Sequence, residues 1–93
     1  MTETIKLGQI VMSATIHDWA NSVDSLVRHE ALLGILARHA KGDWGDLCPE
    51  DAEMNEDALL HGDRLLSVYT LENTPIWIIT EADRSVTTIF FPS

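Results

Sequence analysis

Apolar residues recur at intervals of three and four in the first half of the chain, which predicts helices. Residues 16–21 form a short helical segment, and Ser13 or Thr15 is available to cap its start. A longer helix is predicted over residues 23–40, where the apolar positions are so dense that we expect the helix to be well buried. Gly34 in its middle costs about 1 kcal/mol relative to alanine, so it indicates either a close approach to another element or a break in the helix.

A third helix is predicted over residues 49–60. Pro49 fits the first turn of a helix, the acidic residues that follow it suit the positive end of the helix dipole, and Gly62 supplies a stop. The apolar face of this helix is thin, with Ala52 and Leu59 as its main members.

From Arg64 onward the apolar period changes from helical to alternating, which predicts strands. Polar turns at 72–74 and 81–85 divide this region into three strands, and two successive hairpins form an antiparallel meander. Residues 5–12 are rich in β-branched side chains and are expected to add an edge strand. The sequence therefore predicts one α+β domain over residues 1–93, a three- to four-stranded antiparallel sheet with about three helices packed on one face.

The first strand of the meander has two faces, and the prediction assigns Leu66 and Val68 to one of them and to the core. The opposite face carries Leu65, Ser67, Tyr69 and Leu71. Across the whole chain, the residues that we expect to be mostly buried are Trp19, Leu33, Leu36, Leu66, Val68, Ile76, Ile78 and Phe90.

Charge is the one unusual feature of the composition. Fifteen acidic residues against six Lys and Arg give a formal net charge of −9. Seven of the acids lie within fifteen residues that contain no Lys or Arg: Asp43, Asp46, Glu50, Asp51, Glu53, Glu56 and Asp57. Such a field repels phosphate, which argues against direct nucleic-acid binding, and it attracts a basic protein surface. The alternative is an acidic helix that only keeps the protein soluble.

Cys48 is the only cysteine in the sequence, so no internal disulfide is expected and a reducing cytoplasm suits the chain. The neighbouring acids disfavour a thiolate, so we expect an unreactive, half-buried thiol. No apolar run reaches the roughly 18 residues of a membrane helix, and the start of the chain lacks the profile of a signal peptide. A membrane is therefore not expected as a partner.

Neither a metal nor a cofactor is expected. The histidines are scattered rather than paired at metal-ligand spacing, and no glycine-rich nucleotide-binding motif occurs. His39 could approach Asp43 and Asp46 at the turn, but a histidine at a helix end beside turn aspartates explains the same residues.

An enzymatic alternative lies at the ends of the predicted meander. Metal-independent ribonuclease toxins use a small sheet that carries a general base and an arginine for the phosphate. The candidates for these roles are His39, Arg64, Tyr69 and Arg84, near Thr80, Glu81, Asp83 and Thr87. Alternatively, Glu81, Asp83 and Arg84 are turn residues that form ordinary surface ion pairs. The negative net charge of the protein also disfavours a polyanionic substrate.

Trp44 lies between glycines and aspartates in a tight turn over residues 42–47. A tryptophan in such a turn is either a docking anchor for a partner or a lid that closes the core. A small domain needs its large aromatic residues mainly for burial, so we expect a structural role for Trp44.

Two motifs stand out, GDWGDL over residues 42–47 and WIITEADRSVTT over residues 77–88. Together with residues 7–12 and the pair Arg38-His39, they resemble a family of small uncharacterised proteins of bacterial plasmids, integrative elements and prophages, often labelled plasmid-related proteins. The family has no established activity, so the resemblance implies a genetic context, a gene carried on mobile elements. Small acidic proteins in that setting often bind host proteins, including restriction and CRISPR machinery.

The resulting hypothesis is a small acidic accessory protein of mobile elements that acts by protein–protein binding. Its seven clustered acids would bind a basic surface of a bacterial host protein and so inhibit or modulate a defence or nucleic-acid enzyme. The alternatives are the ribonuclease-like enzyme and an antitoxin-type regulator, which would share the binding surface. A cytoplasmic location is expected, and a homodimer is left open.

Overall fold

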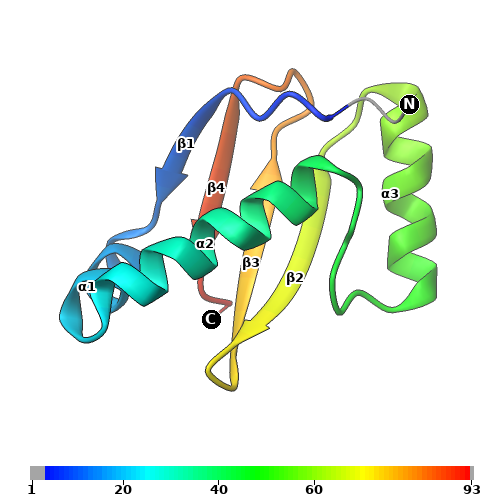
Figure 1. Ribbon diagram of the computed structural model, residues 1–93. Coiled ribbons are helices and arrows are strands. Elements are labelled where there is room, and N and C mark those ends of the chain that lie inside the picture. Colours follow the sequence, from blue (N-terminus) through cyan, green and yellow to red (C-terminus); the bar gives the residue numbers. More distant parts are fainter. Residues whose placement is uncertain (1–3, 93) are drawn as a thin grey trace.

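Three helices and four strands make up the structure, a computed structural model that describes residues 4–92. In chain order they are β1 (Gln9–Met12), α1 (Ala14–Ser22), α2 (Ser25–Ala40), α3 (Pro49–His61), β2 (Leu65–Leu71), β3 (Thr74–Thr80) and β4 (Val86–Phe90). The strands form one sheet in the order β1-β4-β3-β2, with α1 and α2 on one face and α3 beside β2 (Figure 1). The predicted α+β class and the C-terminal antiparallel meander are confirmed.

Strand β1 departs from the prediction because it runs parallel to β4, which makes the sheet mixed. It is also shorter than the predicted 5–12 segment. The Gln9 N–H donates to the Ser85 carbonyl at 3.0 Å, and the Ser13 N–H donates to the Ile89 carbonyl at 2.9 Å. The parallel orientation is possible because three helices and two strands separate β1 from β4, which leaves ample chain for a crossover.

The helices begin and end close to the predicted residues, because local signals determine their ends. The Ser13 hydroxyl accepts a hydrogen bond from the Ile16 N–H at 3.2 Å and caps α1. Helix α3 begins at Pro49 and ends before Gly62, whose φ of 71° lies in the left-handed region that glycine adopts at little cost.

The expected deep burial of α2 is wrong. Its buried residues, Leu32, Ile35 and His39, lie on a single stripe that faces the sheet. By contrast, Leu26 is 77% exposed and Leu33 is 66% exposed. A helix on one face of a sheet buries only the residues that contact its neighbours, here the sheet and α1, and the rest of α2 stays exposed.

Gly34 neither approaches another element nor breaks α2. A Cβ at this position would meet nothing within 4 Å in the part of the chain that the structure describes. We therefore expect Gly34→Ala to raise the free energy of unfolding by up to about 1 kcal/mol, the difference in helix propensity between the two residues. In a domain of this size the Tm should rise by about 4–8 °C in a thermal melt. A lower Tm would show that the glycine has a packing role.

The sheet buries a different set of residues from the one predicted. Its helix-covered face carries Leu65, Ser67, Tyr69, Ile76, Ile78, Thr80, Thr87 and Ile89. Thus Ile76 and Ile78 are buried as predicted, whereas Leu66, Val68 and Phe90 lie half-buried on the other face. Trp19 and Leu36 are half-buried against the core, and Leu33 is exposed. The prediction favoured the face of β2 that carries Leu66 and Val68, but the helices cover the face that carries Ser67.

The face turned away from α1 and α2 is apolar, and no described helix packs across it; we call it the open sheet face. Its apolar members are Val11, Leu66, Val68, Trp77, Ile79, Val86 and Phe90. The rings of Trp77 and Phe90 lie 6.0 Å apart at 60°. Neighbouring side chains shelter one another in this way, which explains why most of them are half-buried without a covering layer.

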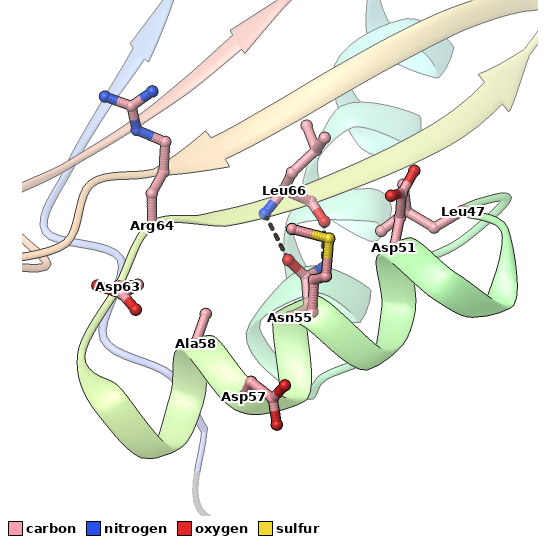
Figure 2. Close-up of a pocket in the computed structure, with 9 residues that line it drawn as sticks. Leu47, Asp51, Asn55, Asp57, Ala58, Asp63, Arg64 and Leu66 are labelled. Atoms are coloured by element: carbon pink, nitrogen blue, oxygen red, sulfur yellow. Dashed lines mark hydrogen bonds between the residues drawn. The ribbon is translucent and has the colours of Figure 1, made fainter.

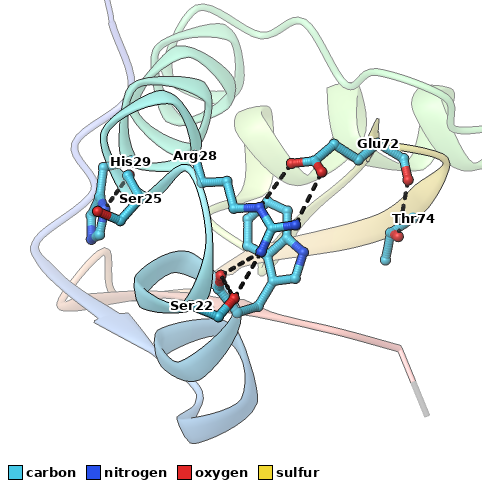
Figure 3. Close-up of polar contacts among 7 residues, drawn as sticks. Ser22, Ser25, Arg28, His29, Glu72 and Thr74 are labelled. Carbon is cyan, nitrogen blue, oxygen red and sulfur yellow. Dashed lines mark hydrogen bonds and ion pairs between the residues drawn. The ribbon is translucent and has the colours of Figure 1, made fainter.

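Arg28 connects the two N-terminal helices to the β2–β3 turn (Figure 3). Its guanidinium donates to both carboxylate oxygens of Glu72, at 2.9 and 3.0 Å. It also donates to the Trp19 carbonyl at 2.7 Å and lies 4.3 Å from the centroid of the Trp19 ring. Since its side chain is only 11% exposed, solvent screens this ion pair less than the other three of the described structure.

The outer edge of β2 is closed by residues that precede it in the chain. The Asn55 side chain bonds both main-chain groups of Leu66, accepting from its N–H at 3.2 Å and donating to its carbonyl. Farther along the strand, Val68 donates to the Trp44 carbonyl at 3.2 Å and accepts from the Asp46 N–H at 2.7 Å. Because open edges tend to pair with other chains, these bonds protect this side of the sheet.

Candidate functional site: a groove between α3 and β2

A groove of about 440 Å³ lies between α3 and β2 (Figure 2). Its apolar lining consists of Leu47, Met54, Ala58 and Leu66. Its acidic lining consists of Asp51, Asp57 and Asp63, and Asn55 and Arg64 complete it. Carboxylates therefore lie next to exposed apolar surface, a combination that suits a ligand with an apolar part and a cationic part.

The position of α3 follows from a few contact residues. Asn55 and Ala58 are its buried residues, 5% and 6% exposed, and they lie on the side of the helix that faces β2. The small Ala58 side chain permits a close approach, while Asn55 bonds the strand edge. Met54 remains 67% exposed because it lies to the side of this narrow contact. The thin apolar face predicted for this helix thus leaves a groove open along it.

Asp43, one of the seven predicted binding acids, belongs to the turn instead. Its carboxylate accepts from the Arg38 guanidinium at 2.7 and 3.2 Å and from the Gly45 N–H at 3.1 Å. The hydrogen bonds from Arg38, and then the one from Gly45, lower the pKa of Asp43. Its charge is already partnered within the molecule.

Asp46 and Glu56 are also engaged internally. The Asp46 carboxylate accepts from the Thr70 hydroxyl at 2.9 Å, and the Glu56 carboxylate accepts from the Trp44 indole N–H at 3.0 Å. Trp44 is 7% exposed and meets His39 edge-on, with ring centroids 5.9 Å apart. The burial predicted for Trp44 is confirmed, and Glu56 satisfies its polar atom.

The other four predicted acids, Glu50, Asp51, Glu53 and Asp57, are exposed on α3. Two of them, Asp51 and Asp57, line the groove, and they are joined there by Asp63, which the sequence analysis did not include. The signal for Asp63 was its place directly after the Gly62 helix stop and before a strand, where the chain turns back toward the helix.

A chain of hydrogen bonds crosses the interior between α2 and the sheet. His39, which is 0% exposed, bonds the Ser67 hydroxyl through Nδ1 at 2.5 Å and the Thr80 hydroxyl through Nε2 at 2.8 Å. The Thr80 and Thr87 hydroxyls lie 2.8 Å apart, and the Thr87 hydroxyl donates to the Leu7 carbonyl at 2.7 Å. Within residues 4–92 no buried side-chain polar atom lacks a partner.

The chain of bonds fixes the direction of the bond at Nε2 of the histidine. A carbonyl only accepts, so the Thr87 hydroxyl donates to Leu7 and accepts from Thr80. Thr80 therefore accepts from Nε2–H of His39. Burial, with a smaller contribution from the charge of Arg84, lowers the pKa of His39 to about 4. The imidazole is therefore neutral at pH 7, and its Nδ1 accepts from the Ser67 hydroxyl.

The four residues of the enzymatic alternative do not meet at an accessible site. His39 is enclosed, and the Tyr69 hydroxyl donates to a main-chain carbonyl of the 42–47 turn at 2.5 Å. Burial raises the pKa of Tyr69 to about 12. Arg64 forms an exposed ion pair at 3.2 Å, and Arg84 donates to two main-chain carbonyls at 2.7 and 3.1 Å. A general base must reach its substrate, and a histidine with no exposed surface does not.

Cys48 is exposed rather than half-buried, so that expectation is wrong. The residue occupies the N-cap of α3, where the chain turns outward. Across residues 4–92, no group of three or more His, Cys, Asp or Glu side chains is arranged to hold a metal ion. The helices of that same region are all too short or too polar to cross a membrane.

Comparison of the chain with known protein families, with curated proteins and with solved structures finds no match. The geometry and charge of the groove are therefore the basis on which a function is assigned.

Proposed function

We propose that this protein is a small acidic accessory protein of bacterial mobile elements that acts by protein–protein binding in the cytoplasm. It binds a basic surface of a host protein and thereby inhibits or modulates a defence enzyme, of the restriction or CRISPR kind, or another nucleic-acid enzyme. The observation that carries the proposal is the groove in which Asp51, Asp57 and Asp63 lie beside apolar side chains. The mobile-element context rests on the two sequence motifs.

The groove suits a lysine or arginine side chain of the partner. Such a side chain has an apolar stem and a charged head, so the stem packs on Leu66 and Met54 while the head meets the carboxylates. Arg64 does not compete for them, because its guanidinium donates to Glu81 at 3.2 Å, and Figure 2 shows it extending away from α3. Three carboxylates remain for an incoming cation.

The distribution of charge supports a partner that normally binds nucleic acid. Proteins that hold phosphate backbones present clustered Lys and Arg, and an acidic protein surface occupies such a site by electrostatic attraction. The net charge of −9 accelerates encounter with a basic surface at low salt. Binding should therefore weaken as the salt concentration rises.

The test compares two triple variants that remove the same charge. The groove variant carries Asp51→Asn, Asp57→Asn and Asp63→Asn. We expect it to bind a lysine- and arginine-rich peptide at least about tenfold more weakly than the wild type, as judged by isothermal titration calorimetry. Its Tm should change little, because exposed charges contribute little to stability.

The matched control carries Asp18→Asn, Asp24→Asn and Glu30→Gln, three exposed residues outside both the groove and the acidic segment 43–57. It should keep most of the affinity for the peptide. Host proteins captured from a bacterial lysate by the wild type and the control, but not by the groove variant, identify the partner. Equal losses in both variants would mean that net charge alone binds the peptide, which contradicts a groove site.

A further inference from the structure

The side chains of the open sheet face form one contiguous apolar surface. Val68, Trp77 and Phe90 are paired across three strands and form one row, and Leu66 and Ile79 are paired in the next. None of the four strands contains an Asp, Glu, Lys or Arg residue, although 23% of the chain is charged. A contiguous apolar surface with polar margins is typical of a protein-binding site.

The acidic groove borders this face along β2. Leu66 belongs to both, because it lies on the open sheet face and also lines the groove (Figure 2). The three acidic residues of the groove therefore lie at the margin of the face. Arg64 and Glu81, just outside β2 and β3, pair with each other at 3.2 Å and add no net charge at that end. An occupant of the face thus meets carboxylates along one side.

We infer that the open sheet face binds an amphipathic helix of the partner. The apolar side of this helix packs across the sheet, and lysine or arginine residues on its flank enter the groove. The inference rests on the proposed function and specifies the form of the partner. The bound helix covers the sheet as α1 and α2 cover the opposite face, so that both faces of the sheet become buried (Figure 1).

The dimensions of the face fit one helix. Strands β2 and β3 have seven residues each and extend about 24 Å, the length of a helix of about 16 residues. Helix α2, which packs on the opposite face, has 16 residues. Addition of a strand beside the groove is disfavoured, because Asn55 and residues 44–46 already bond the main chain of β2.

Charge favours a basic helix over a second copy of this chain. A second copy would bring another net charge of −9, and its own groove carboxylates, to the same side of the sheet. Such copies repel each other at low salt. A helix with lysine or arginine along one flank instead complements the carboxylates, while its apolar side chains contact the uncharged face.

The test uses two synthetic peptides of about 16 residues with the same leucine and lysine content. In the helical peptide leucine recurs every three or four positions, and in the alternating peptide leucine and lysine alternate, which favours a strand. We expect the helical peptide to bind the wild-type protein at least about tenfold more tightly in isothermal titration calorimetry. Equal affinities would overturn this inference but leave binding of cations in the groove intact. Failure of both peptides to bind would contradict the proposed function as well.

Val68→Thr together with Val86→Thr tests the face itself. The change puts hydroxyls on the apolar surface, while threonine keeps the strand propensity of valine. It should weaken binding of the helical peptide at least about tenfold. The matched control, Val23→Thr together with Val27→Thr, makes the same changes at residues that are 59% and 66% exposed, and it should keep the affinity. Equal losses in the two variants would overturn the inference.

A second measurement does not depend on any variant. In an NMR titration of the wild-type protein, the helical peptide should shift the indole N–H signal of Trp77, which lies on the open sheet face. The indole signal of Trp19 should stay in place, because Trp19 packs against the core on the opposite side of the sheet. An unchanged Trp77 signal would overturn the inference. So would a dimer of the wild type that is lost on Val68→Thr with Val86→Thr, because a second copy would then cover the face.

Discussion

Replacing Gly45 by alanine is expected to lower the free energy of unfolding by about 2–5 kcal/mol, which combines about 1–2 for a left-handed backbone and about 1–3 for overpacking. The φ of Gly45 is 72°. A Cβ there would overlap the Val68 carbonyl oxygen and would lie 2.7 Å from the Tyr69 ring. Neither neighbour has room to move, because the carbonyl is bonded to Asp46 and the ring is buried.

Gly62→Ala is the matched control for this experiment. Its φ of 71° is nearly the same, but nothing described lies within 4 Å of the added Cβ. In the control the free energy of unfolding should fall only by the cost of the left-handed backbone, about 1–2 kcal/mol. Chemical denaturation of both variants measures the difference, which reports how closely the 42–47 turn packs on β2. Equal losses would contradict that close approach.

Acidification is expected to destabilise the protein by up to about 3 kcal/mol between pH 6.5 and 4 through His39 alone, at about 1.4 kcal/mol per pKa unit. The unfolded chain binds a proton at His39 near its ordinary pKa of 6.5, whereas burial lowers the folded pKa to about 4. The unfolded state therefore takes up more protons in this window, so stability is full above it and is lost as the pH falls through it. The carboxylates with lowered pKa values, Asp43, Glu72 and Asp83, lose their contributions at lower pH.

His39→Gln isolates this effect, because an amide keeps a donor and an acceptor but does not titrate in this range. The variant should be less stable than the wild type at neutral pH but should show a flatter stability profile between pH 6.5 and 4. His61→Gln, at an exposed position, should keep the wild-type profile. NMR of the imidazole nitrogens should show a neutral ring with the proton on Nε2 well below pH 6. A charged ring at pH 6 would contradict the lowered pKa of His39.

The faces of the sheet show where the sequence pattern was insufficient. Alternation located all three strands of the meander, but it does not say which face is covered. The covered face carries Ser67, Thr80 and Thr87, which appear polar in sequence yet are satisfied by His39 and by one another. The bonds of His39 to Ser67 and Thr80 join residues 28 and 41 positions apart. A polar side chain can be buried in a core when another residue forms a hydrogen bond with it. Here those residues lie far away in the chain, so the local sequence pattern does not reveal them.

For the acidic segment, too, the sequence predicted the helix but not the contacts of its side chains. The sequence placed five of its seven acids on a third helix and the other two in the turn before it, and the structure has that helix. Docking of α3 then separated the acids, since Asp43, Asp46 and Glu56 bond neighbouring groups while Asp51 and Asp57 line the groove. Asp63 joined the groove only because the chain reverses after Gly62.

The sequence by itself determined the order and limits of the helices, the meander, the burial of Trp44 and the concentration of negative charge. These follow from capping residues, glycine and proline positions and apolar periods, which act over a few residues. Only the tertiary structure decided which sheet face α1 and α2 cover, that β1 lies parallel to β4, and which acids remain free. Those features depend on how distant elements pack together, because burial and hydrogen bonding are satisfied over the whole fold and not within any one segment.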